Sequence, residues 1–265
     1  MSNIKLENLE INDYMIYQDK DSFNFGIDAV LLANFALREY GSKKSDATIN
    51  ICDFCTGTLP IPLIMYAKRK LFLGNNMKIT AFEIDKDQVS ICNKSIKYNK
   101  ENVSDAINID SDIKVICDDI KNIDKEKDKY KTIYESFDMI TCNPPYIKSG
   151  SGIKNLNDKK IIARHEVFIT FEEICKVAQK ILKSNKKFYL VHHSERFAEI
   201  ACVLKSYSFE IKKVQFIYPR VDKRSTLCLI EAVKNAKSSL KVLEPIIVFD
   251  RDGSYTKNIE NIYGK

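Results

Sequence analysis

Asn143, Pro144, Pro145 and Tyr146 form the segment whose residue types point most directly to chemistry. Each proline fixes its own φ at about −65° and favours an extended residue before it, so the Asn143 amide and the Pro144 carbonyl lie on a stiff turn. Neither proline nitrogen can donate a hydrogen bond. The Asn143 side-chain oxygen and the Pro144 carbonyl can therefore accept both hydrogens of a planar amino group, and Tyr146 adds a stacking face.

This arrangement suits methylation of an exocyclic amine, whose lone pair is delocalised into its ring. Two acceptors favour the pyramidal nitrogen of the transition state, and the proton becomes acidic once the nitrogen carries the methyl group. No strong general base is needed, in keeping with a sequence that holds only three histidines. The alternative is a proline-rich turn that simply ends a strand.

The segment from Asp53 to Thr58 lies between a predicted strand and a predicted helix. Its only glycine is Gly57, so the G-x-G-x-x-G pattern that cradles a dinucleotide pyrophosphate is missing. A cofactor without phosphates fits better, and S-adenosylmethionine is such a cofactor. Asp53 could hold its ammonium group directly or through water, unless this is an ordinary strand-to-helix turn.

Acidic residues also end the next two predicted strands. Glu83 could accept both ribose hydroxyls of a nucleoside cofactor, and Asp118 or Asp119 could accept from its adenine amino group. Each acid alone is more often a solvated strand end. Together with Asn143 they would share one edge of a sheet, and this shared position is what favours a cofactor site.

Short apolar runs alternate with segments of helical period, which predicts βαβ units in a Rossmann-like, doubly wound α/β fold with a seven-stranded sheet. The expected strands are 48–54, 78–82, 112–117, 137–142, 187–192, 210–218 and 226–233. The expected helices are 28–40, 61–70, 87–99, 170–183 and 195–207. Residues 121–131 are expected to form a solvated loop or a short surface helix.

We expect a single domain over residues 1–265, because a chain of this length buries enough surface to fold without a disulfide or metal. Residues 1–45 would be an N-terminal cap segment and residues 46–235 the core. Residues 236–265 would be a C-terminal hairpin extension, with Asp252 and Gly253 in its turn.

The composition, with 45% hydrophobic and 29% charged residues, is that of a globular protein and excludes a mainly disordered chain. No apolar run is long enough to span a membrane, and the first residues lack the pattern of a secretory signal, so we expect a cytoplasmic protein. The eight cysteines are mostly scattered, which favours reduced thiols. Cys52 and Cys55 form a C-x-x-C without a second pair at ligand spacing, so no metal site is expected.

The 42 basic residues exceed the 36 acidic ones, a mild excess that suits a polyanionic partner. Five basic residues cluster around the last two predicted strands, with Phe216 and Tyr218 between them: Lys212, Lys213, Arg220, Lys223 and Arg224. Such a cluster could bind phosphates and stack bases. A solvated sheet edge explains it equally well.

Four stretches give the chain a resemblance to a known family: FGIDAVLL at 25–32, DFCTG at 53–57, NPPY at 143–146 and ARHE at 163–166. With them the chain resembles class I S-adenosylmethionine-dependent amino methyltransferases, and most closely the bacterial valine tRNA adenine-N6 methyltransferase family. The last residues, 245–264, also look similar. NPPY alone is shared with rRNA and DNA amino methyltransferases and with release-factor glutamine methyltransferases.

The resemblance implies a site. Asp53 and Gly57 would line the methionine end of the cofactor, Glu83 the ribose and Asp119 the adenine. Asn143 would hold the target amine, with Tyr146 stacked on the flipped base.

Gly26 and Asp28 would close over the methyl donor, although Asp28 as a helix cap is an equal explanation. Arg164 and His165 would belong to a loop that orders over bound RNA, unless His165 is structural. The family usually has glycines where Cys55 and Leu59 stand, and this departure bears on cofactor affinity.

The implied activity is methyl transfer to N6 of an adenine in tRNA, next to the anticodon of a valine tRNA, by a monomer or weak dimer. One alternative is another amine acceptor on the same catalytic turn, either an rRNA base or a release-factor glutamine. The other is a catalytically silent RNA-binding protein with this fold, an alternative that the glycine-poor turn raises.

Overall fold

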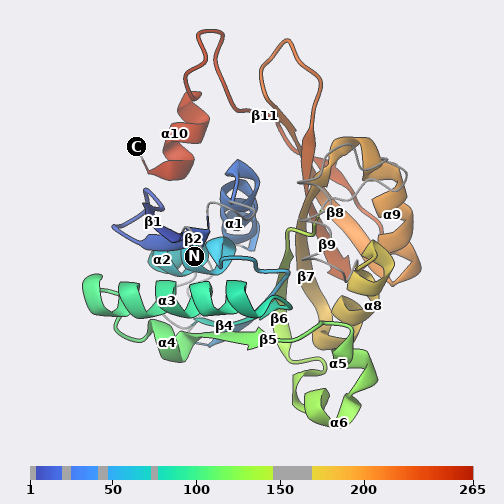
Figure 1. The fold of residues 1–265 in the computed structure, drawn as a ribbon. Coiled ribbons are helices and arrows are strands. Elements are labelled where there is room, and N and C mark those ends of the chain that lie inside the picture. Colours follow the sequence, from blue (N-terminus) through green and yellow to red (C-terminus); the bar gives the residue numbers. More distant parts are fainter. Residues whose placement is uncertain (1–3, 20–24, 41–46, 73–76, 146–168, 265) are drawn as a thin grey trace, which may run out of the picture.

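The structure, a computed structural model, describes residues 4–19, 25–40, 47–72, 77–145 and 169–264. At its centre five neighbouring strands run parallel (Figure 1). In spatial order they are β5 (Ile113–Cys117), β4 (Met77–Glu83), β3 (Ile49–Phe54), β6 (Phe137–Cys142) and β7 (Leu182–His193).

The sheet continues beyond β7 with antiparallel strands. β9 (Leu227–Lys234) pairs antiparallel with β7, and β8 (Phe209–Tyr218) pairs antiparallel with β9. Two short strands, β10 (Lys241–Val242) and β11 (Ile246–Ile247), then pair in parallel with β8. The predicted α/β class and its seven principal strands are confirmed.

Helices cover both faces of the sheet, so its central strands are apolar on both sides. Side chains alternate accordingly: Ile51 and Met139 join one core cluster, whereas Cys52 and Ile140 join the other. One layer contains α1 (Ile27–Tyr40), α2 (Pro60–Phe72) and α3 (Lys86–Asn102), with α4 (Ile109–Asp112) before β5. The other contains α5 (Asn122–Lys125), α6 (Lys127–Tyr130), α8 (Phe171–Ile181) and α9 (Phe197–Ser206).

The helix signals of the sequence are reproduced locally. Thr170 caps α8, since its hydroxyl accepts from the Glu173 amide while the Glu173 carboxylate accepts from the Thr170 amide. The segment 121–131 forms α5 and α6, and the following turn, η1 (Lys131–Ile133), continues it. Because Ile123 and Tyr130 are buried, this segment is more than a solvated loop.

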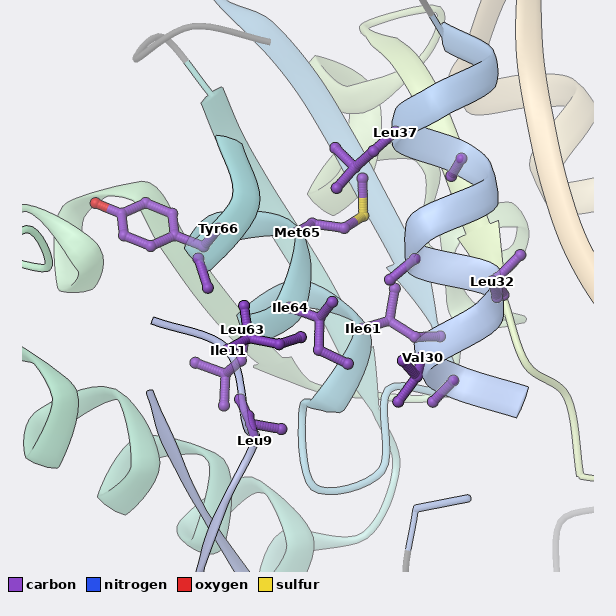
Figure 2. Packing of buried hydrophobic residues seen from close by; sticks show 14 of the residues in the cluster. Leu9, Ile11, Val30, Leu32, Leu37, Ile61, Leu63, Ile64, Met65 and Tyr66 are labelled. Atoms are coloured by element: carbon purple, nitrogen blue, oxygen red, sulfur yellow. The ribbon is translucent and has the colours of Figure 1, made fainter. Parts of the chain in front are cut away.

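α1 is buried on most of its circumference, from Ala29 to Leu37. Val30 and Leu37 lie against Ile61 and Met65 of α2, as Figure 2 shows. A helix that is apolar on nearly all sides needs neighbours on all sides. The expected N-terminal cap segment thus contains a helix that packs against α2, β7 and β9.

The sequence analysis did not predict the N-terminal hairpin of β1 (Ile4–Asn8) and β2 (Met15–Asp19). It is held to α3 by Asn99, whose amide nitrogen donates to the Met15 carbonyl at 2.7 Å and whose oxygen accepts from the Met15 amide at 2.9 Å. The Asn99 side chain therefore takes the place of a neighbouring strand for β2.

At the C-terminal end, the predicted hairpin is present as a bridge between Phe249 and Tyr255. The helix that follows, α10 (Lys257–Tyr263), was not predicted. Buried Lys68 of α2 donates to the Ile262 carbonyl and, at 2.8 Å, to the Asn34 side chain. Lys68 thereby ties the end of α10 to α1 and α2.

Candidate active site

Because β3, β4, β5 and β6 are parallel and adjacent, their carboxyl ends lie along one edge of the sheet. Asp53, Glu83, Asp119 and Asn143 each lie at or just beyond one of these ends, as the sequence predicts. We call them, with Gly57, the parallel edge. Tyr146, Arg164 and His165 lie outside the described residues.

The turn after β3 has an unusual backbone. Cys55, Gly57 and Leu59 have φ values of 55°, 57° and 79°, in the left-handed region that favours glycine. The turn is held to β4 by the Thr56 amide, which donates to the Phe82 carbonyl at 3.0 Å. Leu59 is fully buried in the core, and this burial offsets its backbone strain. The two departures from glycine thus leave the turn in a glycine-like conformation.

Gly57 borders open space. A Cβ added to Gly57 would meet no atom within 4 Å among the described residues. The residue is glycine because of its positive φ, and its bare backbone leaves room for a ligand to approach.

Asp53 is buried, with 1% of its surface exposed. Its Oδ1 accepts from the Thr141 hydroxyl at 2.5 Å, but its Oδ2 has no hydrogen-bond partner within the described ranges. Burial raises the pKa of Asp53 to about 7, with a smaller contribution from the charge of Glu83, against the opposing effects of the Thr141 and Thr56 hydroxyls. A buried acceptor of this kind is stabilised by a cation or a hydrogen-bond donor, and the ammonium group of S-adenosylmethionine fits it.

Glu83 organises the same edge. Its Oε2 accepts from the Gly57 amide at 2.8 Å, while its Oε1 accepts from the Ile84 and Asp85 amides at 2.9 and 3.0 Å. Burial raises the pKa of Glu83 against the effect of these three donors. A carboxylate has about four acceptor positions, so one remains, which serves one ribose hydroxyl rather than the two expected from the sequence.

Asp118 and Asp119, which the sequence left as alternatives, have different surroundings. Burial opposes ionisation of Asp118, but Lys129, Tyr130 and Asn122 outweigh it and lower its pKa to about 2. Asp119 accepts from the Lys121 amide at 2.9 Å, and its other oxygen lies 3.5 Å from the Lys121 ammonium. Asp118 is thus committed to its own loop, and Asp119 is the better candidate for adenine.

Asn143 is linked to the N-terminus of α1, a contact that the sequence analysis did not predict. Its Nδ2 donates to Asp28 Oδ2 at 3.0 Å. This bond directs the amide oxygen of Asn143 away from Asp28. Gly26 permits the arrangement, because a Cβ there would lie 2.7 Å from Asp28 Oδ1. Asp28 is therefore a partner of Asn143 as well as a residue of the first turn of α1.

The basic turn, which we define as Arg220, Lys223 and Arg224, joins β8 to β9. Since Ile217 and His193 both pair with Leu227, this turn lies at the same edge as the carboxyl end of β7. Arg220 and Lys223 lie 3.6 and 3.9 Å from Asp222.

Two other lysines of the predicted basic cluster, Lys212 and Lys213, are engaged elsewhere. Lys212 donates to Lys237 and Ser239, and Lys213 pairs with Glu39 and Glu231. The cluster therefore divides, and only the basic turn faces this edge.

The described residues contain neither a metal-binding cluster nor a membrane-spanning helix. No group of three or more histidine, cysteine, aspartate or glutamate side chains in these ranges could hold a metal ion. No described helix is long and apolar enough to cross a membrane.

The strand order, the antiparallel last pair and the polar edge define the class I S-adenosylmethionine-dependent methyltransferase fold. A predicted O-methyltransferase from Agrobacterium tumefaciens superimposes with a TM-score of 0.65 at 20% identity, over 89% of this chain and 95% of that one. A class I S-adenosylmethionine-dependent methyltransferase from Listeria monocytogenes gives 0.56 at 12% identity, over 86% and 67%. At these identities the solved structures establish the fold.

Among curated proteins, the chain is similar to the tRNA1(Val) (adenine(37)-N6)-methyltransferase of Shewanella sediminis. The two are 26% identical over 249 residues, which cover 91% of this chain and 92% of that protein. The Haemophilus influenzae protein of the same name is 21% identical over 245 residues, covering 92% and 91%. No protein-family model matches the chain. The resemblance that the sequence motifs indicated is confirmed by these relatives.

Proposed function

We propose that this protein transfers the methyl group of S-adenosylmethionine to N6 of an adenine in tRNA, next to the anticodon of a valine tRNA. The names of its curated relatives state this activity for those proteins. The observation in this chain that carries the proposal is the hydrogen bond between Asn143 and Asp28 at the end of β6. This bond orients the side chain of Asn143, which in the proposal accepts a hydrogen bond from the target amine.

The parallel edge provides the cofactor site. Asp53, whose Oδ2 has no hydrogen-bond partner among the described residues, and the open backbone at Gly57 would hold the methionine end. Glu83 would accept from the ribose and Asp119 from the adenine. When bound, S-adenosylmethionine supplies an electrophilic methyl group on its sulfonium.

Asn143 and Pro144 would align the amine. The Asn143 amide oxygen and the Pro144 carbonyl accept its two hydrogens, and this favours the pyramidal geometry in which the nitrogen lone pair is available. Asp28 keeps the Asn143 amide from rotating. Tyr146 would stack on the extruded base, and the proton of the methylated nitrogen would leave to the same acceptors or to water.

Arg164 and His165 would contact the RNA from the segment that precedes α8, and the basic turn would bind its phosphates. In this proposal residues 1–265 act as one methyltransferase domain in the cytoplasm. No feature of the described residues favours an rRNA base or a release-factor glutamine as the acceptor. The silent scaffold is disfavoured by the glycine-like turn at Cys55 and Leu59, which keeps the cofactor edge in shape.

The deciding experiment is transfer of radiolabelled methyl from S-adenosylmethionine into tRNA, rRNA, DNA and release factor from cells that lack this gene. We expect label only in tRNA, as N6-methyladenine, and none with Asn143→Ala. Label in rRNA or release factor would show that the proposed substrate is wrong, while the proposed mechanism of amine methylation would stand. If no acceptor is labelled and no cofactor binds, the protein is the silent scaffold.

A further inference from the structure

Three aromatic side chains near the C-terminus stack in a column that the active site does not use. The rings of Phe249 and Tyr255 are 5.2 Å apart and inclined by 13°, and those of Tyr255 and Tyr263 are 5.9 Å apart and inclined by 23°. We call these three residues the aromatic ladder. The other ring pairs of the described chain cross at 56° or more.

A short hairpin holds the first two rings of the ladder side by side. Phe249 and Tyr255 form its bridge, and the Asp250 amide donates to the Ser254 carbonyl at 2.9 Å. The turn is closed by Asp252, which accepts from the Ser254 amide at 3.0 Å and from its hydroxyl at 2.6 Å. The backbone hydrogen bonds of the hairpin and the Asp252 side chain therefore fix the positions of these two rings.

The first two rings of the ladder are exposed, whereas Tyr263 is partly buried against the core. Phe249 is 37% and Tyr255 39% accessible, and neither belongs to the two core clusters. A nucleobase can extend a stack of parallel, accessible rings, whereas an edge-to-face pair offers no continuous stack to extend. Stability of the core does not account for two exposed rings in this geometry.

The ladder lies beside the basic turn. β11 pairs in parallel with the end of β8, and the next two amides, of Val248 and Phe249, donate to the Tyr218 and Pro219 carbonyls at 2.9 Å each. The chain thus places Phe249 next to the first residue of the β8–β9 connection. Both segments extend beyond the sheet in the same direction (Figure 1).

The two segments differ in charge. The basic turn has three cations and one acid, Asp222. The hairpin is balanced, because Arg251 and Lys257 are matched by Asp250 and Asp252. The basic turn can therefore attract phosphates, and the ladder offers an aromatic surface for stacking. Single-stranded RNA can bind to both, because its bases are accessible, whereas the bases of a duplex are buried.

The distance to Asn143 suits a nucleic-acid loop. The ladder follows β11, which lies beyond β8 in the sheet, so four strand steps of about 4.8 Å, or about 19 Å, separate it from β6. Stacked nucleotides advance by about 3.4 Å, so about six of them span this distance. A base on the ladder would belong to the same loop as the target base.

We propose that the aromatic ladder and the basic turn form a second RNA site, which stacks an unpaired base of the substrate loop several nucleotides from the methylated adenine. This inference rests on the proposed function in that the substrate is RNA. It adds the hairpin at 248–256 and the end of α10 to the RNA-binding surface.

The direct test uses the absence of tryptophan from the sequence. In Phe249→Trp the new indole keeps the stack and is the only tryptophan, so a base stacked on it quenches its fluorescence. The probes are an RNA stem-loop with a seven-nucleotide loop and a blunt RNA duplex of equal length. We expect quenching by the stem-loop and none by the duplex. The matched control is Tyr98→Trp on α3, where the ring meets Tyr17 edge-on and neither RNA should quench.

A second test separates stacking from charge. In Phe249→Leu/Tyr255→Leu we expect affinity for the stem-loop to fall about 10-fold for each base that no longer stacks, with an unchanged salt dependence. Arg220→Gln/Lys223→Gln/Arg224→Gln should instead flatten the slope of log affinity against log salt, by about one for each phosphate that the turn no longer binds. Cofactor binding, measured by calorimetry without RNA, should be unaltered in both.

Two results would refute base stacking on the aromatic ladder without affecting the proposed RNA methylation. One is an unchanged stem-loop affinity in Phe249→Leu/Tyr255→Leu, and the other is equal quenching of Phe249→Trp by the duplex and the stem-loop. An unsubstituted protein that binds neither RNA and methylates release factor would remove the proposed substrate as well. Methyl-transfer and binding assays on the same preparations thus distinguish the two failures.

Discussion

Asp53, Glu83 and Asn143 lie where parallel strands end, whereas the basic turn lies where two antiparallel strands are joined. The first region is buried, with Asp53 at 1% and Glu83 at 8% exposure. In the second, the Lys223 side chain is 53% exposed. Parallel strands bring separate segments of chain to one edge, so each can contribute a fixed acceptor. An antiparallel pair instead provides a turn that extends outward, where it can meet a large partner.

This difference predicts a division of labour. Changes at the parallel edge should alter turnover or cofactor affinity and leave RNA affinity intact. Changes at the basic turn or the aromatic ladder should do the reverse. A variant at the parallel edge that lowers RNA affinity, or one at the basic turn or aromatic ladder that lowers turnover or cofactor affinity, would contradict this division.

The largest effect is expected at Asn143. Asn143→Ala removes one of two acceptors for the target amine, so kcat should fall roughly 100- to 1,000-fold, the range for loss of one preorganised transition-state hydrogen bond. Cofactor affinity, measured by calorimetry, and stem-loop affinity should be unchanged. A variant with normal turnover would rule out the role of Asn143 at the amine.

Asp28 should follow, because it acts through Asn143. In Asp28→Ala the Asn143 amide loses its hydrogen bond to Asp28, and a small misplacement of the amide lowers kcat by roughly 10- to 100-fold. Asp28→Asn is the conservative control, since its side-chain oxygen can still accept, and it should retain more activity. A rise in KM for RNA without a fall in kcat would show that Asp28 serves binding instead.

The basic turn should show the opposite pattern. Arg220→Gln/Lys223→Gln/Arg224→Gln is expected to weaken RNA binding roughly 10-fold or more at moderate salt while kcat at saturating RNA stays near normal. As a matched control, Lys212→Gln removes a lysine that donates to Lys237 and Ser239 away from the turn. A large loss of kcat in the triple variant would place the turn within the catalytic region.

Cofactor affinity should depend on pH through Asp53. Its pKa of about 7 means that the carboxyl is largely protonated below pH 7. The cofactor ammonium pairs with the ionised form, so binding should tighten as pH rises from about 5 to 7, by at most about tenfold per unit, and then level off. Calorimetry across this range measures the change. Asp53→Asn should bind weakly at every pH, and an equally steep profile in that variant would assign the proton to another group.

The same shift has a consequence for the stability of the free protein. The Asp53 pKa is raised from 3.8, so the unfolded chain releases its proton at lower pH than the folded chain does. The free energy of unfolding should therefore decrease from about pH 4 to about pH 7 through this group. Bound cofactor should reduce that loss, which thermal unfolding with and without it can measure.

The regular elements could be predicted because their signals are local. The strand Phe137–Cys142 has the same bounds as the apolar run that predicted it, and Thr170 with Glu173 marks the start of α8. The N-terminal hairpin and α10 escaped prediction for a common reason. Each depends on a polar side chain from a distant helix, Asn99 for the hairpin and Lys68 for α10, and no local pattern records such a contact.

The same limit applies to the candidate site. Because Asp53, Glu83 and Asn143 follow predicted strands, the sequence predicted that they share one edge of the sheet. The hydrogen bond between Asn143 and Asp28 could not be predicted in this way, because it joins residues 115 apart in sequence. Thr141 was missed although it is a polar residue inside an apolar strand, a signal that a buried partner is nearby. The sequence motif did mark Cys55 and Leu59 as departures from glycine, and the backbone shows the strain that they carry.

Cys55 provides the smallest and sharpest test of how the parallel edge is built. Its φ of 55° strains any residue other than glycine, so Cys55→Gly should raise the free energy of unfolding by about 0.5 to 1 kcal/mol and Tm by about 1 to 3 °C. Cys202→Gly, in the exposed interior of α9, is the matched control and should lower stability by about 0.3 kcal/mol. Leu59→Gly should also destabilise, since the buried side chain outweighs the strain. Because the turn already has its glycine-like shape, Cys55→Gly should leave cofactor affinity unchanged. A clear gain in affinity would instead mean that the Cys55 side chain obstructs the cofactor.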